Sequence, residues 1–382
     1  MNKLRMGMIG GGEGAFIGAV HRIAARMDNE IELVAGAFSS NAQKAKLSGE
    51  ALGIAPERNY PDYATMITKE ALLPANKRIH FVSIVTPNHV HFEPTKMALE
   101  KGFDVVLDKP MTLTLAEAKA LAVIVENTQR TFCLTHTYTG YPMVKQAKQM
   151  VLNGTIGEIR KVYVEYPQGW LSTNLESTNQ KQAAWRTDPT KSGIAGAMGD
   201  IGTHAFNLAE YVSNLQVTKL CADINIKVPG RLLDDDGAVL LKFNNGASGV
   251  LMATQIGAGE ENNVKIRVFG TLGSVEWQQQ DANTLAVRWL DAPTQIYRTG
   301  GGYNSSYASH NTRTPAGHPE GYLEAFANHY RNFALTVKAK LNNEMPLPEW
   351  LDFPGVAEGI RGMQFIERVI ESGNSSTKWL DF

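Results

Sequence analysis

Cysteine, strong net charge and long apolar runs are all scarce in this sequence. Its 382 residues include two cysteines, Cys133 and Cys221, which lie far apart and have no metal-binding spacing. Both lie in apolar stretches, where buried reduced thiols are the simpler interpretation, and this favours a reducing compartment. The formal net charge of −1 gives no indication of a nucleic-acid partner. The composition is that of an ordinary globular protein with enough apolar residues for two domain cores.

Membrane and metal signals are also missing. No stretch approaches the roughly 18 apolar residues of a membrane span, and the first apolar run is too short for a signal peptide. We therefore expect a cytoplasmic protein with no membrane partner. His89 and His91 lack a third ligand of suitable spacing, and the acidic run 234–236 is interpreted as a solvated turn rather than a calcium loop. No metal site is predicted.

The first third of the chain alternates between two apolar periods. Strands are predicted at 4–9, 31–38, 79–85, 105–107 and 131–135, and helices between them at 17–27, 42–52, 94–101 and 115–127. Strands that alternate with helices of this length pair in parallel, because a parallel crossover needs a dozen or more residues. The pattern predicts an α/β Rossmann domain, a doubly wound parallel sheet, over residues 1–140.

The pattern changes after about residue 157. Strands follow one another at 159–166, 217–228, 237–243, 247–255, 264–269, 274–278 and 285–290, some of them separated by short turns. Helices are predicted at 202–212, 321–341 and 356–372, and the loosest segment is 299–319. We expect a second, α+β domain over residues 141–382 with a large, mainly antiparallel sheet. The alternative for its C-terminal helices is that they pack back on the first domain.

A glycine-rich turn ends the first predicted strand. Gly10, Gly12 and Ala15 fit the dinucleotide fingerprint, and Gly18 is a candidate for the glycine that packs the helix, after a three-residue insertion. Such a turn lets the backbone approach a pyrophosphate at the positive end of the next helix. Because this turn joins a strand to a helix near the chain start, it predicts dinucleotide binding. Phe16 and Ile17, which open that helix, are further candidates for contact with the cofactor.

The end of the second strand leaves the choice of cofactor open. A carboxylate there would bond the ribose hydroxyls of NAD, and none is present. Ser39, Ser40 and Lys44 have the chemistry to hold the 2′-phosphate of NADP. The alternative is that residues 39–41 simply cap a helix. The cofactor is therefore expected to be NAD or NADP.

Two further segments follow strands of the parallel sheet, at the edge where ligands bind in this architecture. Thr86, Pro87 and Asn88 follow one strand, with His91 close behind, and Asp108, Lys109 and Pro110 follow the next. We therefore expect both segments to face the cofactor, with Thr86, Pro87, Asn88, His91, Asp108 and Lys109 as candidates for binding it. A lysine beside a nicotinamide can hydrogen-bond a substrate hydroxyl or shuttle its proton. An ordinary surface lysine beside a proline is the other interpretation.

Asp200 and His204 are four residues apart, so a helix would place both side chains on one face. Oxidation of an alcohol requires removal of the hydroxyl proton, and histidine is the usual base for that near neutral pH. A carboxylate one turn away would orient the imidazole or hold a second substrate hydroxyl. An ordinary helix N-terminus with an acidic first turn is the alternative.

Taken in order, these segments resemble the glucose–fructose oxidoreductase, inositol dehydrogenase and rhizopine-catabolism (Gfo/Idh/MocA) oxidoreductase family. The resemblance covers nearly the whole chain, although the family's usual Glu-Lys-Pro is Asp-Lys-Pro here. It implies that Lys109, Asp200 and His204 meet at the nicotinamide, with His204 as the acid/base. It also implies a homodimer or homotetramer. Other stretches resemble a longer-chain branch with scyllo-inositol and sugar dehydrogenases.

The resemblance implies a hydride transfer between NAD(P) and a secondary alcohol of a cyclic polyol or sugar. Candidates for holding the hydroxyls of such a substrate are Tyr166, Arg186 and His318, alongside Lys109, Asp200 and His204. Structural roles are the alternatives: an ion pair for Arg186, a helix cap for His318 and Glu320, and a place in the core for Tyr166. Two other functions remain open, a glycoside-cleaving enzyme that oxidises its substrate transiently and a non-catalytic cofactor-binding regulator.

Overall fold

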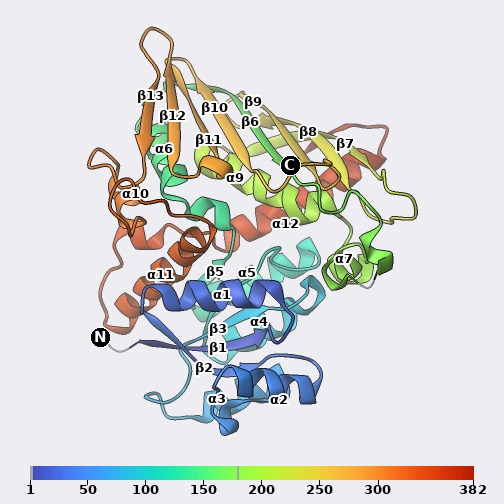
Figure 1. Cartoon of the computed structure of the whole chain (residues 1–382), viewed down its shortest axis with the longest axis vertical. Coiled ribbons are helices and arrows are strands. Elements are labelled where there is room, and N and C mark those ends of the chain that lie inside the picture. The colour runs from blue at the N-terminus through green and yellow to red at the C-terminus, as the bar shows by residue number, and fades with distance from the viewer. Residues whose placement is uncertain (1–2, 179) are drawn as a thin grey trace. The chain divides into compact units, whose positions relative to one another are not determined.

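The chain folds into two compact units in the computed structural model, which describes residues 3–178 and 180–382. Unit 1 consists of Met1–Gly140 and Tyr322–Ile360, and unit 2 of Tyr141–Gly321 and Arg361–Phe382. Each unit has its own sheet. Figure 1 shows the elements of both units.

Unit 1 is built on a parallel sheet of five strands in the order β2-β1-β3-β4-β5. The strands are β1 (Leu4–Gly10), β2 (Ile31–Ala37), β3 (Phe81–Val85), β4 (Asp104–Leu107) and β5 (Phe132–Leu134). Since β1 lies between β2 and β3, the strand order reverses at β1, and this is the switch point where ligands bind in such sheets. The predicted Rossmann architecture is confirmed.

The helices of unit 1 are α1 (Phe16–Met27), α2 (Ala42–Ala51), α3 (Tyr63–Leu72), α4 (Phe92–Glu100), α5 (Leu115–Thr128) and α11 (Tyr322–Leu341). Although α11 is distant in sequence, its apolar residues complete the core of this unit. Phe326, Tyr330 and Phe333 are buried in one cluster with Met6 of β1 and Val20 of α1.

Unit 2 contains a sheet of nine strands in the order β13-β12-β11-β10-β6-β9-β8-β7-β14. The strands are β6 (Ile159–Pro167), β7 (Val217–Asn225), β8 (Asp236–Phe243), β9 (Ser248–Thr254), β10 (Lys265–Gly270), β11 (Gly273–Gln278), β12 (Thr284–Trp289), β13 (Gln295–Arg298) and β14 (Trp379–Asp381). All neighbouring pairs are antiparallel except β6 and β9, which pair in parallel. The predicted mainly antiparallel sheet is confirmed.

Helices of unit 2 cover one face of this sheet (Figure 1). The helical elements are α6 (Pro142–Leu152), α7 (Lys181–Arg186), α8 (Pro189–Ser192), the π-helical turn η5 (Met198–Gly202), α9 (Thr203–Ser213), α10 (Ser306–His310) and most of α12 (Val356–Asn374). Phe206 of α9 stacks on Phe365 of α12, with the ring centroids 4.7 Å apart. Strand residues alternate so that Val162, Val164 and Leu251 point to this apolar side.

Several elements escaped sequence analysis, notably α3, α6, β13 and β14. The segment 299–319, expected to be a loose loop, contains the short helix α10. Among the described residues, no helix has the length and apolarity needed to cross a bilayer. The same residues bring together no group of three or more His, Cys, Asp or Glu side chains suited to hold a metal ion.

Candidate functional site

The glycine turn after β1 is packed so closely that side chains are excluded. Gly10 and Gly11 have positive φ angles of 81° and 71°, which favour glycine. A Cβ on Gly18 of α1 would lie 2.3 Å from the Cα of Gly11, so Gly18 is the residue that lets helix and turn touch. The predicted packing role of Gly18 is therefore confirmed. Because no side chains lie between turn and helix, backbone groups alone line the start of α1. A pyrophosphate binds to this arrangement in Rossmann domains.

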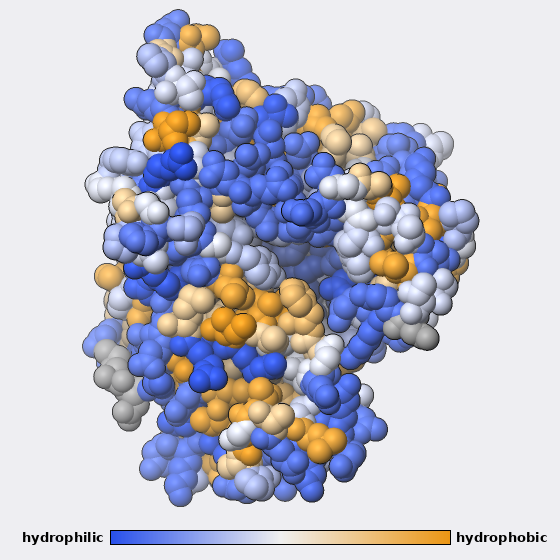
Figure 2. Space-filling view, in the orientation of Figure 1, coloured by the Kyte–Doolittle hydropathy of each residue, from blue (hydrophilic) through white to orange (hydrophobic). Residues whose placement is uncertain are grey.

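The next residues of the turn contact the end of β2. The amide of Gly12 donates to the carbonyl oxygen of Phe38 at 3.2 Å, and a Cβ on Gly12 would lie 2.7 Å from that oxygen. Figure 2 shows apolar residues at the surface of unit 1 around α1. Phe16, the first residue of α1, has 65% of its surface exposed. Contact of Phe16 with the cofactor stays a prediction. The residues present therefore fit a dinucleotide.

Residues at the end of β2 cap a helix. The Asn41 side chain accepts a hydrogen bond from the amide of Lys44 at 2.9 Å, and the Ser39 hydroxyl accepts from the amide of Asn41 at 3.2 Å. This is the structural alternative considered for these residues. Asn41 and Ser40 are exposed, and a 2′-phosphate role for Ser39, Ser40 and Lys44 stays a prediction.

His91 connects the two segments that follow β3 and β4. Its Nδ1 lies 2.8 Å from the carbonyl oxygen of Pro110, and its Nε2 lies 2.9 Å from that of Thr86. The ring is fully buried, and burial lowers the pKa of His91. A neutral imidazole has one N–H, so it donates to one carbonyl at a time. His91 thus holds the loops of Thr86 and Pro110 together rather than facing solvent.

The carboxylate of Asp108 contacts the backbone of Lys109 and belongs to a hydrogen-bonded network that the sequence did not indicate. Its Oδ1 accepts hydrogen bonds from the amide of Lys109 at 3.0 Å and the hydroxyl of Thr135 at 3.0 Å. The Nε2 of buried His21 lies 3.7 Å from the same oxygen. Burial opposes ionisation of Asp108, but His21 and Lys109 outweigh it and lower its pKa to about 2. The Nδ1 of His21 is 2.7 Å from the hydroxyl of Tyr330, which anchors the network to α11.

In unit 2, the predicted pair lies at the start of one helix. Asp200 belongs to the π-helical turn η5, and His204 to the first turn of α9. Such turns occur frequently at functional sites. His204 is 9% exposed, and its ring centroid is 6.4 Å from that of Tyr166. The helix predicted at 202–212 is confirmed, and the wider turn that contains Asp200 directly precedes it.

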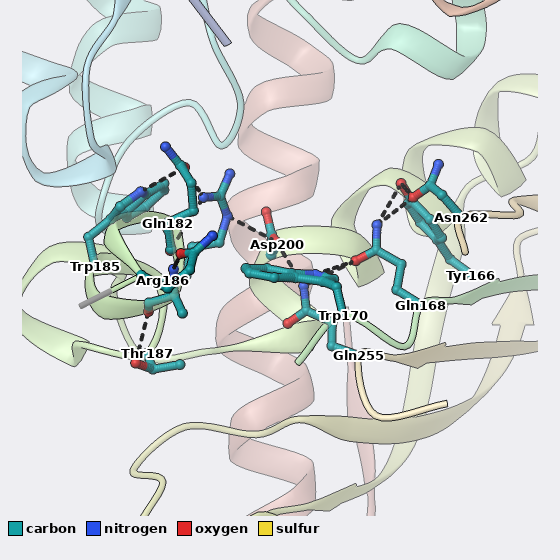
Figure 3. A network of polar contacts seen from close by, with 12 residues as sticks. Tyr166, Gln168, Trp170, Gln182, Trp185, Arg186, Thr187, Asp200, Gln255 and Asn262 are labelled. Atoms are coloured by element: carbon teal, nitrogen blue, oxygen red, sulfur yellow. Dashed lines mark hydrogen bonds and ion pairs between the residues drawn. The ribbon is translucent and has the colours of Figure 1, made fainter. Parts of the chain in front are cut away.

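Arg186 contacts Asp200, as Figure 3 shows. Its Nε lies 3.3 Å from Oδ2 of Asp200, and its guanidinium lies over the ring of Trp185, 4.4 Å from the centroid. The ion pair that the sequence offered as one interpretation of Arg186 is thus present. Its partner, Asp200, is itself a predicted substrate residue. The same guanidinium donates to Oε1 of Gln182 through Nη1, so Arg186 links α7 to Asp200.

Trp170 and three polar residues that the sequence did not indicate extend this network (Figure 3). Gln255 donates to Oδ2 of Asp200 at 2.9 Å and to Oε1 of Gln168 at 3.4 Å. The Trp170 indole also donates to Oε1 of Gln168, at 3.0 Å. Gln168 in turn bonds Asn262. Gln168 and Gln255 each follow one strand of the parallel pair β6–β9, a signal visible only once that pairing is known.

Two further predicted substrate residues differ in exposure. Tyr166 is buried, with its hydroxyl 2.8 Å from Oδ1 of Asn262, so it supports the network from within. His318 is exposed, and its Nδ1 lies 3.2 Å from the carbonyl oxygen of Pro315 in its own loop. Glu320 binds the amides of Arg313 and Thr314 in that loop. Substrate contacts by Tyr166 and His318 stay predictions.

Comparison with known proteins gives matches along most of the chain. Residues 4–136 match the model of the oxidoreductase family with an NAD-binding Rossmann fold, and residues 144–276 match the GFO/IDH/MocA C-terminal domain. An uncharacterised oxidoreductase of Bacillus subtilis, YfiI, is 34% identical over 99% of this chain and 97% of its own. Levoglucosan dehydrogenase of Pseudarthrobacter phenanthrenivorans is 27% identical over 78% of this chain and 79% of its own.

Solved structures agree with these matches. An inositol dehydrogenase homologue from Azotobacter vinelandii, in complex with NAD+, is 35% identical, with a TM-score of 0.95 over 100% of this chain and 98% of its own. A second structure from that organism contains NADH and myo-inositol and has a TM-score of 0.92, with the same identity and coverage.

Proposed function

Because the chain belongs to the Gfo/Idh/MocA family of oxidoreductases and its N-terminal part is an NAD-binding Rossmann domain, we propose that it oxidises a secondary alcohol of an inositol or a pyranose. Unit 1 binds the dinucleotide in this proposal, and unit 2 binds the substrate. NADP stays a predicted alternative to NAD.

The polar cluster around Asp200 carries the proposal. One carboxylate, the guanidinium of Arg186 and the amides of Gln255 and Gln168 lie within one hydrogen-bonded network, one helical turn from His204. Charged and amide groups in this density match a ligand that presents several hydroxyls. The related structure with myo-inositol supports the same class of substrate.

The proposed chemistry divides between two groups. NAD+, held at the glycine turn after β1, would supply the acceptor for the hydride of the carbinol carbon. His204 accepts the hydroxyl proton, and Lys109 donates a hydrogen bond to the same oxygen, so that charge does not build up on it. Asp108, ionised at all working pH values because its pKa is about 2, holds the backbone amide of Lys109.

Turnover tests the proposal directly. The purified protein is mixed with NAD or NADP and each of a panel of inositols, hexoses and their lactones, and reduced nicotinamide is followed by absorbance. We expect turnover with at least one cyclic polyol or sugar. Cofactor binding without turnover on any member would overturn the proposal. Product release from glycosides without added cofactor would establish transient oxidation instead, and failure there as well would favour a regulator.

We also propose that the exposed face of the nine-stranded sheet joins two copies of the chain. Met252 of β9 is 49% exposed, and it lies beside Glu165 of β6 in the parallel register. A hollow on this face is lined by Tyr163, Val164, Glu165, Val250, Met252, Lys265 and Arg267. Opposite charges around an apolar centre suit a self-complementary twofold contact.

The Met252→Asp variant tests this interface. The new carboxylate would lie beside Glu165 in the register and would lose its water in the contact, and both effects disfavour association. We therefore expect the variant to have half the wild-type mass, or less, by light scattering after size exclusion. Leu72→Asp is the control, since Leu72 of α3 is 81% exposed and lies in unit 1. An unchanged mass for Met252→Asp, or a monomeric wild type, contradicts the proposed interface.

The cysteines support a reducing, cytoplasmic environment in this proposal. Neither Cys133 nor Cys221 forms a disulfide. Cys133 is buried as expected, whereas Cys221 is only partly buried, because it lies on β7 next to the short edge strand β14.

A further inference from the structure

The acidic run before β8 is not the solvated turn that the sequence suggests. Asp234 is 6% exposed and Asp235 is 2% exposed. Their carboxylates are buried because backbone amides and Arg231 surround them, and these donors replace the water that the sequence interpretation assumed. The prediction of a solvated turn was therefore wrong.

Asp234 binds three consecutive backbone amides at the start of the helix that carries Asp200. Its Oδ1 accepts from the amide of Gly196 at 2.6 Å, and its Oδ2 accepts from that of Met198 at 2.7 Å. Its carbonyl oxygen accepts from the amide of Ala197 at 2.8 Å. Amides at a helix N-terminus have no partner within the helix, so one residue satisfies all three. A carboxylate there also interacts favourably with the helix dipole.

The contact is tight enough to determine where the helix begins. A Cβ on Gly196 would lie 2.1 Å from the carbonyl oxygen of Asp234, and one on Gly237 would lie 2.4 Å from Cε of Met198. The amide of Asp200 donates to the carbonyl oxygen of Gly196 at 2.8 Å. Asp200 is thus one hydrogen bond away from the segment that Asp234 holds.

We propose that Asp234 is a positioning residue for the reaction: it fixes the N-terminal turn from which Asp200 and His204 project. The inference rests on the proposed function, in which those two side chains act on the substrate. A reactive group displaced by about 1 Å can lose roughly 100-fold in rate, and the widened π-helical turn at Asp200 is held from outside the helix by Asp234.

Asp235 provides a matched control beside it. Its carboxylate is equally buried and also accepts two backbone hydrogen bonds, from Lys227 at 2.8 Å and Val228 at 2.9 Å. It pairs with Arg231 at 3.3 Å. These partners belong to the loop before β8 and not to the helix of Asp200. Loss of Asp235 therefore removes comparable bonds without releasing that helix.

The test compares Asp234→Asn with Asp235→Asn. An asparagine keeps the shape but replaces one acceptor oxygen with a donor that opposes an amide N–H. For Asp234→Asn we expect kcat to fall about 10- to 100-fold with the Kd for NADH unchanged, whereas Asp235→Asn keeps kcat within about threefold. Amide hydrogen exchange followed by mass spectrometry should rise across residues 196–204 in the first variant only.

Each outcome decides one question. Wild-type protein that turns over no polyol or sugar defeats the proposed function. An active wild type with equal kcat in the two variants, or unchanged exchange across 196–204 in Asp234→Asn, overturns the positioning role alone. If Asp234→Asn does not fold, Gly196→Ala takes its place, because it separates the same segments while keeping the carboxylate. A wild-type kcat in Gly196→Ala then overturns the role.

Discussion

Replacing His204 by alanine should lower kcat by about 10²- to 10⁴-fold, the usual contribution of a positioned acid/base group. His204 is almost completely buried in the first turn of α9, so water reaches its position poorly and cannot replace it as a base. The Kd for NADH should stay at the wild-type value, since the glycine turn that fits the cofactor belongs to unit 1. Steady-state kinetics with NADH titration measures both quantities.

Lys109 offers a sharper division of roles within the same experiment. Lys109→Ala removes the donor, whereas Lys109→Arg keeps a positive donor that cannot release its proton. If Lys109 only hydrogen-bonds the substrate oxygen, the arginine variant retains more activity than the alanine variant. If Lys109 shuttles the proton, both lose activity alike. A His204→Ala variant that retains a tenth of the wild-type kcat would remove His204 from the acid/base role.

Acidification should destabilise unit 1 well before its carboxylates are protonated. Burial, helped by the charge of Lys109, lowers the pKa of His136 to about 3, and burial with Arg5 lowers that of His80 to about 4. Both values lie below the unfolded value of about 6.5, so the unfolded state binds more protons below that pH. Stability is complete above pH 6.5 and is lost as the pH falls toward 4 and 3.

Urea midpoints at pH 7.5 and 5.5 measure this loss. Buried His136 should account for up to about 1.4 kcal/mol between the two values, and half-buried His80 for less, because solvent screens its ring. The His136→Asn and His80→Asn variants should each flatten the pH dependence by the share of the replaced histidine, and an asparagine at position 80 can still accept the bond from the Arg5 amide. The control is His89→Asn, because His89 is exposed. An equal pH dependence in all variants would contradict a neutral state of these rings in the folded protein.

Some residues of the candidate site can be predicted from sequence patterns, and others cannot. Lys109, Asp200 and His204 could be predicted because each has a local signal in the sequence. Lys109 follows a strand, and Asp200 and His204 are four residues apart on a helix. Gln168 and Gln255 had no such signal. They come together because Pro167 pairs with Thr254 at the ends of two parallel strands separated by more than 80 residues. No local pattern states which strands of a mainly antiparallel sheet will be neighbours.

The asparagine and serines after β2 have a local signal, but that signal fits two different roles. Their spacing was compatible both with a helix cap and with a phosphate site, and the structure shows Asn41 capping α2. A short polar side chain at that place satisfies the free amides of the helix whether or not a phosphate binds. The cap is therefore observed, and it is compatible with either cofactor.

Sequence alone determined the Rossmann architecture of unit 1, the glycine turn after β1 and the family, because these depend on local period, glycine conformation and the order of short motifs. Tertiary structure alone decided that α11 completes the core of unit 1, that His21 supports Asp108, and that Asp234 is buried. The physical reason is that burial and pairing depend on what the rest of the fold brings against a residue. A run of three aspartates has the same sequence whether it forms a solvated turn or caps a helix. Only the backbone amides that approach it in the folded chain distinguish the two.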